Sequence, residues 1–239
     1  MIYVTNTPNN AGVAIHGDFM DFDELYDALH SIVGDEDQYP PYEAARIRVL
    51  GVCYDIRHAL MGDREIEFVD NGMDEDKMKR LSVITNNKNI YLVINVLWPE
   101  MLFVTMALND FILLNRKKCK HPQWDKTNAA VRKFQAAVTE CIRQTVSEAS
   151  FKRMINKMIH DYTWFDGYAA QYIDMLNCRF LAMDKEKRLK NIPTMAKRLA
   201  EWGQEYRGVR DAVIDAARTH NCPVDDIRLQ LEYPEDIEW

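Results

Sequence analysis

The sequence predicts an α+β fold, with a small mixed sheet and helices in the first half and a helical bundle in the second. Short β-branched and aromatic runs, separated by turn residues, occur only before residue 98, and helical periodicity alone follows. Apolar residues make up 47% of the chain and charged residues 28%, which is typical of globular proteins. With only 9 Gly and 8 Pro, no flexible linker is visible, so we expect residues 1–118 and 119–239 to share one continuous core.

Four segments have the residue types of strands: 2–4, 13–16, 65–69 and 90–96. The first two are expected to form a hairpin, because Pro8 and the Asn residues between them favour a tight turn. Residues 90–96 are almost continuously apolar, which is typical of a strand covered on both faces.

Helices are predicted in the first half over residues 21–33, 42–61 and 75–81. The first begins with acidic residues and is followed by Gly34, as expected from the helix dipole and from C-terminal capping. Apolar residues recur in it at three- and four-residue spacing, so one face is expected to be buried.

The second half is predicted to hold helices over residues 98–116, 125–148, 151–160, 164–182 and 192–220. Pro99 suits a first helical turn, and Pro193 is expected to start the last helix. Residues 90–114 are mostly apolar, but they include Pro99, Glu100 and Asp110 and divide naturally into a strand and a helix. We therefore expect no membrane span and no membrane partner.

The net charge of −7 is unevenly distributed. Residues 1–76 carry 17 acids and 4 bases, residues 77–220 carry 14 acids and 25 bases, and residues 221–239 carry 6 acids and 1 base. Such asymmetry is expected either from an electropositive binding surface or from acidic and basic parts that face each other within one fold.

The five cysteines give no metal-ligand or disulfide pattern. They are widely separated, no CxxC pair exists, and the start of the chain lacks the features of a signal peptide. We expect free thiols and a cytoplasmic location.

Two groups of residues are candidate catalytic residues. Asp55 and His58 lie three residues apart in a predicted helix, where a carboxylate can orient an imidazole for general-base catalysis. Glu65 and Glu67 share one face of a predicted strand beside Asp63, and paired carboxylates of this kind can support metal-dependent phosphodiester cleavage. An ordinary helix with a surface Asp–His contact and a solvated strand face are the more common origins of these two patterns, and no lysine follows in the Glu-x-Lys position.

A basic segment is the candidate nucleic-acid-binding region. Residues 116–157 carry 11 bases and 3 acids, and such a surface can neutralise phosphates. The alternative is a helix face that is solvated or that faces the acidic first 76 residues. The residues expected to make phosphate contacts are Arg116, Lys117, Lys118, Lys120, Lys126, Arg132 and Lys133.

Six short strings carry a resemblance to a known family: TNTPN at 5–9, ELYDALH at 24–30, RVLG at 48–51, CYDIRHA at 53–59, EFVDNG at 67–72 and LWPE at 97–100. The chain resembles a family of uncharacterised bacterial proteins, common in Gram-positive lineages, that carries a domain-of-unknown-function label. The resemblance implies a bacterial cytoplasmic protein and identifies no functional residue.

Two function classes remain from the sequence. The first is a non-catalytic protein-interaction or structural module, with an unidentified protein partner or with self-association into an oligomer. The second is a nucleic-acid-binding protein or weak metal-dependent nuclease that uses the basic segment. Nucleotide-binding, zinc-protease, hydrolase and calcium-loop motifs are absent from the sequence, so no cofactor and no metal site are expected.

Overall fold

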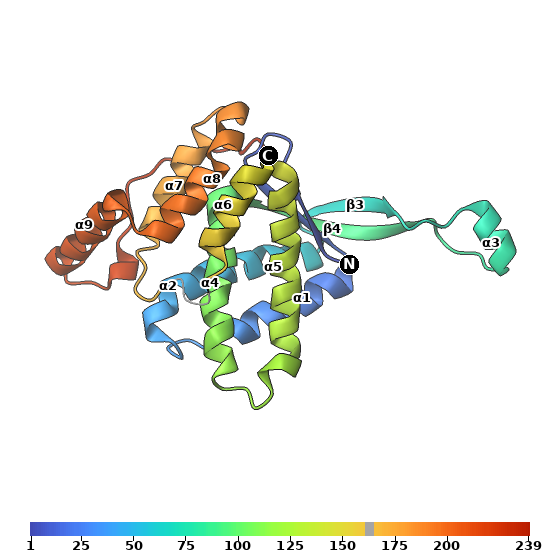
Figure 1. The fold of residues 1–239 in the computed structure, drawn as a ribbon, viewed down its shortest axis with the longest axis horizontal. Coiled ribbons are helices and arrows are strands. Elements are labelled where there is room, and N and C mark those ends of the chain that lie inside the picture. Colours follow the sequence, from blue (N-terminus) through green and yellow to red (C-terminus); the bar gives the residue numbers. More distant parts are fainter. Residues whose placement is uncertain (161–164) are drawn as a thin grey trace.

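The structure of the protein is a computed structural model, and it describes residues 1–160 and 165–239. Its four-stranded sheet consists of β1 (Tyr3–Asn6), β2 (Gly12–Gly17), β3 (Glu65–Asp70) and β4 (Lys88–Leu97). The strands lie in the order β1-β2-β4-β3, and every neighbouring pair is antiparallel. The predicted α+β class and the hairpin of the first two strands are confirmed (Figure 1), and the sheet is antiparallel throughout rather than mixed.

Gly12 is required where β2 crosses the end of β4. It lies opposite Leu97 in the register, and a Cβ at this position would collide with the carbonyl oxygen of Val96. Only glycine allows the two backbones to approach this closely.

The helices pack against the inner part of the sheet and form the second half of the molecule. In the first half, Asp18 and Asp21 form a capping box at the start of α1, so the chain turns sharply from β2 into the helix. The elements are α1 (Phe19–Val33), α2 (Glu43–Leu60), α3 (Glu75–Leu81), α4 (Trp98–Arg116), α5 (Lys126–Thr145), α6 (Glu148–Met158), α7 (Gln171–Leu181), α8 (Lys185–Glu201) and α9 (Gln204–His220), with short 3₁₀ turns at Pro40–Tyr42, Pro122–Trp124 and Val224–Asp226.

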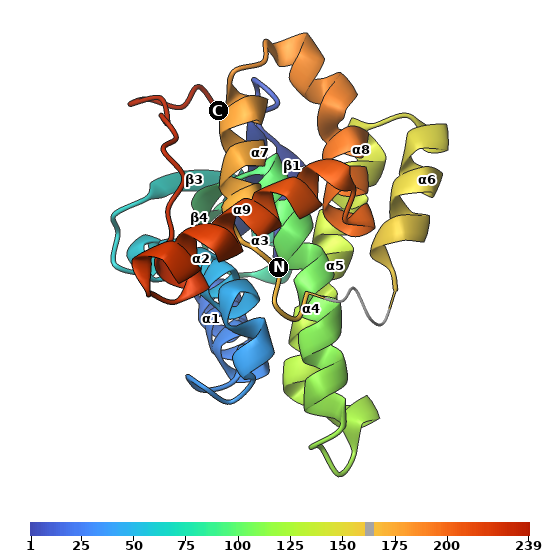
Figure 2. The same ribbon diagram turned by 90° about the vertical axis from the view of Figure 1, so that its left-hand side faces the viewer.

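Helix α4 occupies the centre of the molecule. It contacts α1, α2, α5, α7 and α8 as well as strands β2 and β4, and Figure 2 shows it running between the other helices. Every residue from Met101 to Ile112 is buried. The apolar segment 90–114 is thus the end of one strand followed by a core helix, as predicted. In the described part of the chain, no helix is both long enough and apolar enough to cross a membrane.

The polar groups of α4 are satisfied inside the core. Thr105 donates to the carbonyl oxygen of Met101, and Asn109 donates to that of Met158. Asp110 accepts a hydrogen bond from the backbone N–H of Phe165 at 3.2 Å. Burying these groups without partners would cost free energy, so they fix how the surrounding segments approach the helix.

An aromatic cluster joins α4 to the last helices. Phe103 stacks on Phe165 with ring centroids 4.5 Å apart, and Tyr168 stacks on Tyr206 at 4.7 Å. Trp202 packs against Tyr206 at 5.1 Å. Because one cluster of buried side chains extends from Ile2 to Tyr206, the sheet and the helices of both halves are packed on common side chains.

The last predicted helix, 192–220, was wrong as a single element. The structure has two helices there, because Trp202 adopts a left-handed conformation with φ 42° and Gly203 begins α9 as its N-cap. Pro193 does not start a helix either: Asp184 caps α8, and Pro193 lies inside it. The packing of Trp202 on Tyr206 explains why the chain bends at this point.

Smaller differences concern helix ends in the second half. Helix α5 ends at Thr145 rather than 148, and Ser147 caps α6, which begins at Glu148 rather than 151. The predicted helix 164–182 is observed as α7 from Gln171 to Leu181. Its predicted first residue, 164, lies outside the described residues.

We predict that the aromatic contact on α4 is a major source of stability. Phe103 is fully buried, so Phe103→Ala should lower the free energy of unfolding by about 3–5 kcal/mol. Phe19 begins α1 with its side chain exposed, and Phe19→Ala should change it by less than about 0.5 kcal/mol. Urea denaturation followed by circular dichroism measures both, and equal effects would contradict the central position of α4.

Candidate functional site

The candidate pair Asp55 and His58 lies on α2, but the two side chains have different partners. Asp55 forms an ion pair with Arg64 at 2.7 Å. The Nδ1 atom of His58 lies 2.8 Å from the carbonyl oxygen of Tyr54, and its ring packs on the ring of Tyr54. Neither contact is the carboxylate–imidazole hydrogen bond that general-base catalysis requires.

The structure places a different carboxylate beside a histidine. The Nδ1 atom of His16 lies 2.9 Å from Glu67 Oε2, and its Nε2 atom lies 2.9 Å from Thr5 Oγ1. The ring of His16 stacks on Tyr3. Burial lowers the pKa of His16, and the Glu67 carboxylate opposes part of that effect. The contact joins β2 to β3 across β4.

The other candidate carboxylates do not lie beside Glu67. Asp63 and Glu65 lie with Asp55 along one cavity, whereas Glu67 faces Tyr3 and His16. Among the described residues, no three His, Cys, Asp or Glu side chains are grouped so that they could hold a metal ion.

The basic segment is divided by the fold. Helix α5 packs against the acidic helix α1, and Lys133 lies 3.8 Å from Asp21 and 3.7 Å from Glu24. Arg132 donates to the side chains of Asn109 and Gln135. The remaining candidates lie around the turn between α4 and α5 and at its flanks: Arg116, Lys117, Lys118, Lys120 and Lys126. The exposed Trp124 lies in the same turn.

One feature missed by the sequence analysis is an arm, defined here as residues 65–92. Strands β3 and β4 continue beyond the rest of the molecule as a two-stranded ribbon, and α3 lies at its tip (Figure 1). No residue of α3 is buried. The sequence signal was present, because apolar residues alternate with acids along residues 65–68, but the run 90–96 suggested that β4 is covered along its whole length.

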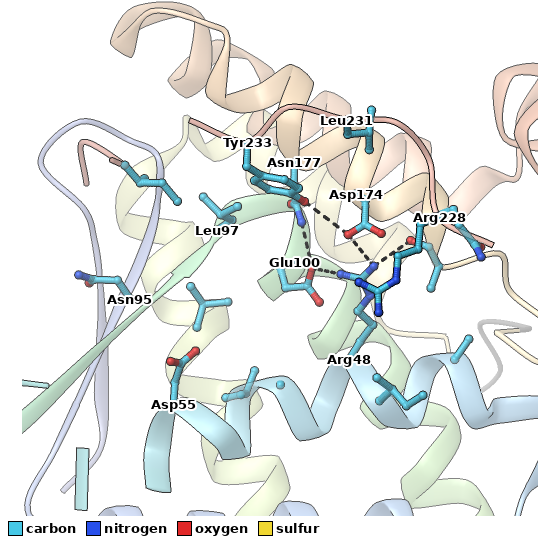
Figure 3. Close-up of a pocket in the computed structure, with 18 of the residues that line it drawn as sticks. Arg48, Asp55, Asn95, Leu97, Glu100, Asp174, Asn177, Arg228, Leu231 and Tyr233 are labelled. Carbon is cyan, nitrogen blue, oxygen red and sulfur yellow. Dashed lines mark hydrogen bonds and ion pairs between the residues drawn. The ribbon is translucent and has the colours of Figure 1, made fainter. Parts of the chain in front are cut away.

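A large cavity is the second feature. It has a volume of about 1260 Å³ and lies between α2, the end of β4, α7 and the C-terminal tail, residues 224–239 (Figure 3). At its centre, Arg48 donates to Glu100 at 3.1 Å, to Asp174 at 2.7 Å and to the carbonyl oxygen of Ala170 at 3.2 Å. Asn177 donates to the same oxygen of Glu100 at 3.0 Å.

At the centre of the cavity, burial and the neighbouring charges shift the pKa values of Glu100 and Arg48 in opposite directions. Burial raises the pKa of Glu100, and Arg48 offsets only part of that effect. For Arg48, burial lowers the pKa, but Glu100 and Asp174 outweigh it, so its pKa lies above the usual value. The guanidinium thus remains charged and links α2, α4 and α7.

The C-terminal tail forms one wall of the cavity. Gln171 donates to the carbonyl oxygens of Val224 and Ile227, both at 2.8 Å, and the hydroxyl of Tyr233 donates to Asp174 at 3.4 Å. Trp239 packs beside Ala11, Leu97 and Leu181, and its carbonyl oxygen accepts from the backbone N–H of Asn9. The tail is therefore fastened at both ends.

Most residues of this cavity were not identified from the sequence. Arg48, Glu100 and Asp174 are more than 50 residues apart from one another along the chain, so no local pattern connects them. One usable signal was the polar stripe of Gln171, Asp174 and Asn177, which recurs every three residues and therefore lies on one helix face.

We predict that Arg48 stabilises the fold through Glu100. Arg48→Met should lower the free energy of unfolding by about 3 kcal/mol, because it leaves a buried carboxylate without its cation, and adding Glu100→Gln should recover part of the loss. The matched control is Arg218→Met, which removes an exposed pair with Asp215 and should change stability by less than about 0.5 kcal/mol. Denaturant unfolding measures the cycle, and additive effects of the two changes at the cavity would contradict the coupling.

Comparison with known proteins identifies the family of the chain but finds no relative of known function. No curated protein and no solved structure matches the chain. Residues 2–239 match the family described as Domain of unknown function (DUF6904). Because the match covers nearly the whole chain, the protein belongs to the DUF6904 family.

Proposed function

We propose that this protein is a non-catalytic interaction module that binds a second copy of itself through the arm. The observation that carries the proposal is an exposed apolar face on a ribbon that projects from the fold (Figure 1).

The apolar residues of the ribbon lie on one face. Phe68 is directly opposite Ile90, and Ile66 is directly opposite Leu92, so the four side chains point the same way. Ile66, Phe68 and Ile90 are 52%, 64% and 58% exposed. Contiguous exposed apolar surface of this kind marks interaction sites in soluble proteins.

The tip of the arm extends this surface. Leu81, Val83 and Ile84, at the end of α3 and just after it, are all exposed. Together with the exposed Ile66, Phe68 and Ile90 of the ribbon, the arm has six exposed apolar side chains. Two copies that bury these side chains would remove on the order of 1,000 Å² from water, near the lower limit of stable protein interfaces. A two-stranded ribbon is marginally stable alone in water, so packing against a partner would also stabilise the arm itself.

The charges of the arm favour a second copy over a strongly charged partner. The whole arm, residues 65–92, carries six acids and four bases, and its outer part, residues 70–90, carries four of each and is therefore neutral in a chain of net charge −7. Asp70 lies opposite Lys88 and follows the apolar residues on the same face. A two-fold axis can therefore place the Asp70 of one copy near the Lys88 of the other, as a self-complementary interface requires.

We predict that Phe68→Ser weakens dimerisation at least tenfold, since aromatic side chains near the centre of an interface contribute most to affinity. Sedimentation-velocity ultracentrifugation of the full chain over a concentration series measures the dimer fraction. Trp124→Ser is the matched control, because Trp124 is an aromatic residue that is even more exposed than Phe68 but lies away from the arm, and it should leave the dimer intact.

Two results would overturn the proposal. One is a wild-type chain that sediments as a monomer at the highest soluble concentration. The other is a dimer that Phe68→Ser leaves unchanged. Circular dichroism checks that the variant is folded, which is expected because the Phe68 side chain is mostly exposed.

A second candidate function is nucleic-acid binding at the turn between α4 and α5. Exposed bases there lie close in the chain to the exposed Trp124, and the combination of cations with an aromatic ring is typical of surfaces that bind single strands. Lys133, which faces α1, and Arg132, which contacts Asn109 of α4, are outside this surface, so it is smaller than the sequence suggested.

If this turn binds nucleic acid, changing Lys117, Lys118 and Lys120 together to Gln should weaken the binding of labelled single-stranded RNA and reduce its salt dependence by up to about three ion equivalents. Fluorescence anisotropy across a salt series measures both quantities. The matched control neutralises Lys185, Lys187 and Lys190, which are equally exposed on α8. The absence of wild-type binding at low salt would remove this candidate.

A further inference from the structure

The cavity beside α7 is an open cleft that is large enough to hold a small-molecule ligand. Its volume of about 1260 Å³ lies just above the range of about 300–1,000 Å³ that is usual for small-molecule sites. Helix α2 forms its floor, α7 one side, and the C-terminal tail crosses it (Figure 3). It lies apart from the exposed apolar face of the arm.

The charges that line the cavity are predominantly negative. Three ion pairs, Arg48 with Glu100 and Asp174 and Arg64 with Asp55, involve three acids and two bases of the lining, which leaves Asp63, Glu65 and Asp225 against Arg228. The lining contains six acids and three bases: Asp55, Asp63, Glu65, Glu100, Asp174 and Asp225, with Arg48, Arg64 and Arg228. The cavity therefore favours a positively charged ligand.

Two buried side-chain amides on α7 each have an oxygen atom that accepts no hydrogen bond from the described residues. Gln171 and Asn177 are 6% and 3% exposed, and both line the cavity. Their amide nitrogens are oriented by carbonyl and carboxylate oxygens, Gln171 by the tail and Asn177 by Glu100. Their side-chain oxygens, Gln171 Oε1 and Asn177 Oδ1, consequently face away from these partners and have no hydrogen-bond partner among the described residues. Unsatisfied buried acceptors are costly, and a ligand that donates hydrogen bonds would satisfy them.

Asp174 lies between these two amides on the same face of α7. Its carboxylate accepts from Arg48 and from the hydroxyl of Tyr233 in the tail. The tail thus contacts Gln171 and Asp174 directly, and the two unpartnered oxygens have almost no contact with solvent. A ligand would reach these two oxygens through a shift of the tail. Of the hydrogen bonds that hold the tail there, the contact of 3.4 Å between Tyr233 and Asp174 is the longest and therefore the weakest.

We propose that this cavity binds a small organic cation with N–H donors, an alkylamine or a guanidine. Its charged group is bound by the Asp174 side of the cavity, and its N–H groups donate to the side-chain oxygens of Gln171 and Asn177. Arg48 positions Asp174 and Glu100 and does not contact the ligand.

The test uses probes that differ in charge but share a four-carbon chain. Isothermal titration and thermal unfolding of the full chain are measured with putrescine, butylamine and agmatine, and with 1,4-butanediol and succinate as neutral and anionic controls. We expect at least one of the three cations to bind and to raise Tm by several degrees near saturation, because a ligand that binds only the folded state stabilises it. The diol and the diacid should have no effect.

A cavity-filling variant separates binding from folding. Gly51 lies on α2 and lines the cavity, and a Cβ there would have open space around it. Gly51→Leu should fill this space, leave the protein folded with an unchanged or higher Tm, and weaken cation binding at least tenfold. Gly208→Leu is the matched control, because Gly208 is also a helical glycine with open space but lies on α9 outside the cavity.

A change of charge tests the recognition itself. Asp174→Asn should weaken cation binding at least tenfold, whereas Asp211→Asn, on the exposed surface of α9, should not. The proposal is overturned if none of the three cations binds at millimolar concentration, if succinate binds instead, or if Gly51→Leu retains full affinity.

Discussion

The burial of α4 on all sides is the constraint on which the rest of the structure depends. A helix that is buried from Met101 to Ile112 has no face available to solvent, so other elements must cover every side of it. The sheet covers its beginning through β2 and β4, and α1, α2, α5, α7 and α8 cover the remainder. Each of these amphipathic elements buries one apolar face against α4, which is why the sheet and the helical half form one cluster of buried side chains.

The same constraint produces the charged centre of the cavity. Glu100 lies in the first turn of α4, where the helix dipole favours an acid, but here the turn is enclosed between α2 and α7. A carboxylate in that position needs donors, and Arg48 and Asn177 provide them. Arg48 in turn requires a second acid, which Asp174 supplies. A helix start that would be ordinary at the surface thus requires a network of four side chains from three helices when it is buried.

Local patterns were sufficient for the elements but not for the features that distinguish this molecule. The strands and most helices followed from periodicity, from acidic residues in first turns and from C-terminal caps such as Gly34. The division at Trp202 could not be predicted, because the ring of this left-handed tryptophan packs on Tyr168, which is distant in sequence, as well as on Tyr206. The cavity could not be predicted for a related reason, since Arg48, Glu100 and Asp174 are brought together only by the packing of α4. The pairing of His16 with Glu67, in place of Asp55 with His58, depends on strand order, which residue spacing does not encode.

Different free-energy terms determine how tightly a partner binds to the arm and how tightly a ligand binds in the cavity. Each 100 Å² of apolar surface removed from water contributes about 2.5 kcal/mol, so burying about 400 Å² of apolar surface between the two ribbons, without the tips, would contribute about 10 kcal/mol. Association costs about 4–15 kcal/mol in lost freedom, so the apolar face of the arm alone is nearly balanced by that cost. Affinity at the arm is then decided by polar residues around the face, such as Asp70 and Lys88, and by the ordering of α3. In the cavity the side chains on α4 and α7 are already ordered, so the main remaining cost is the shift of the tail, and a few hydrogen bonds to preoriented acceptors decide which ligand binds.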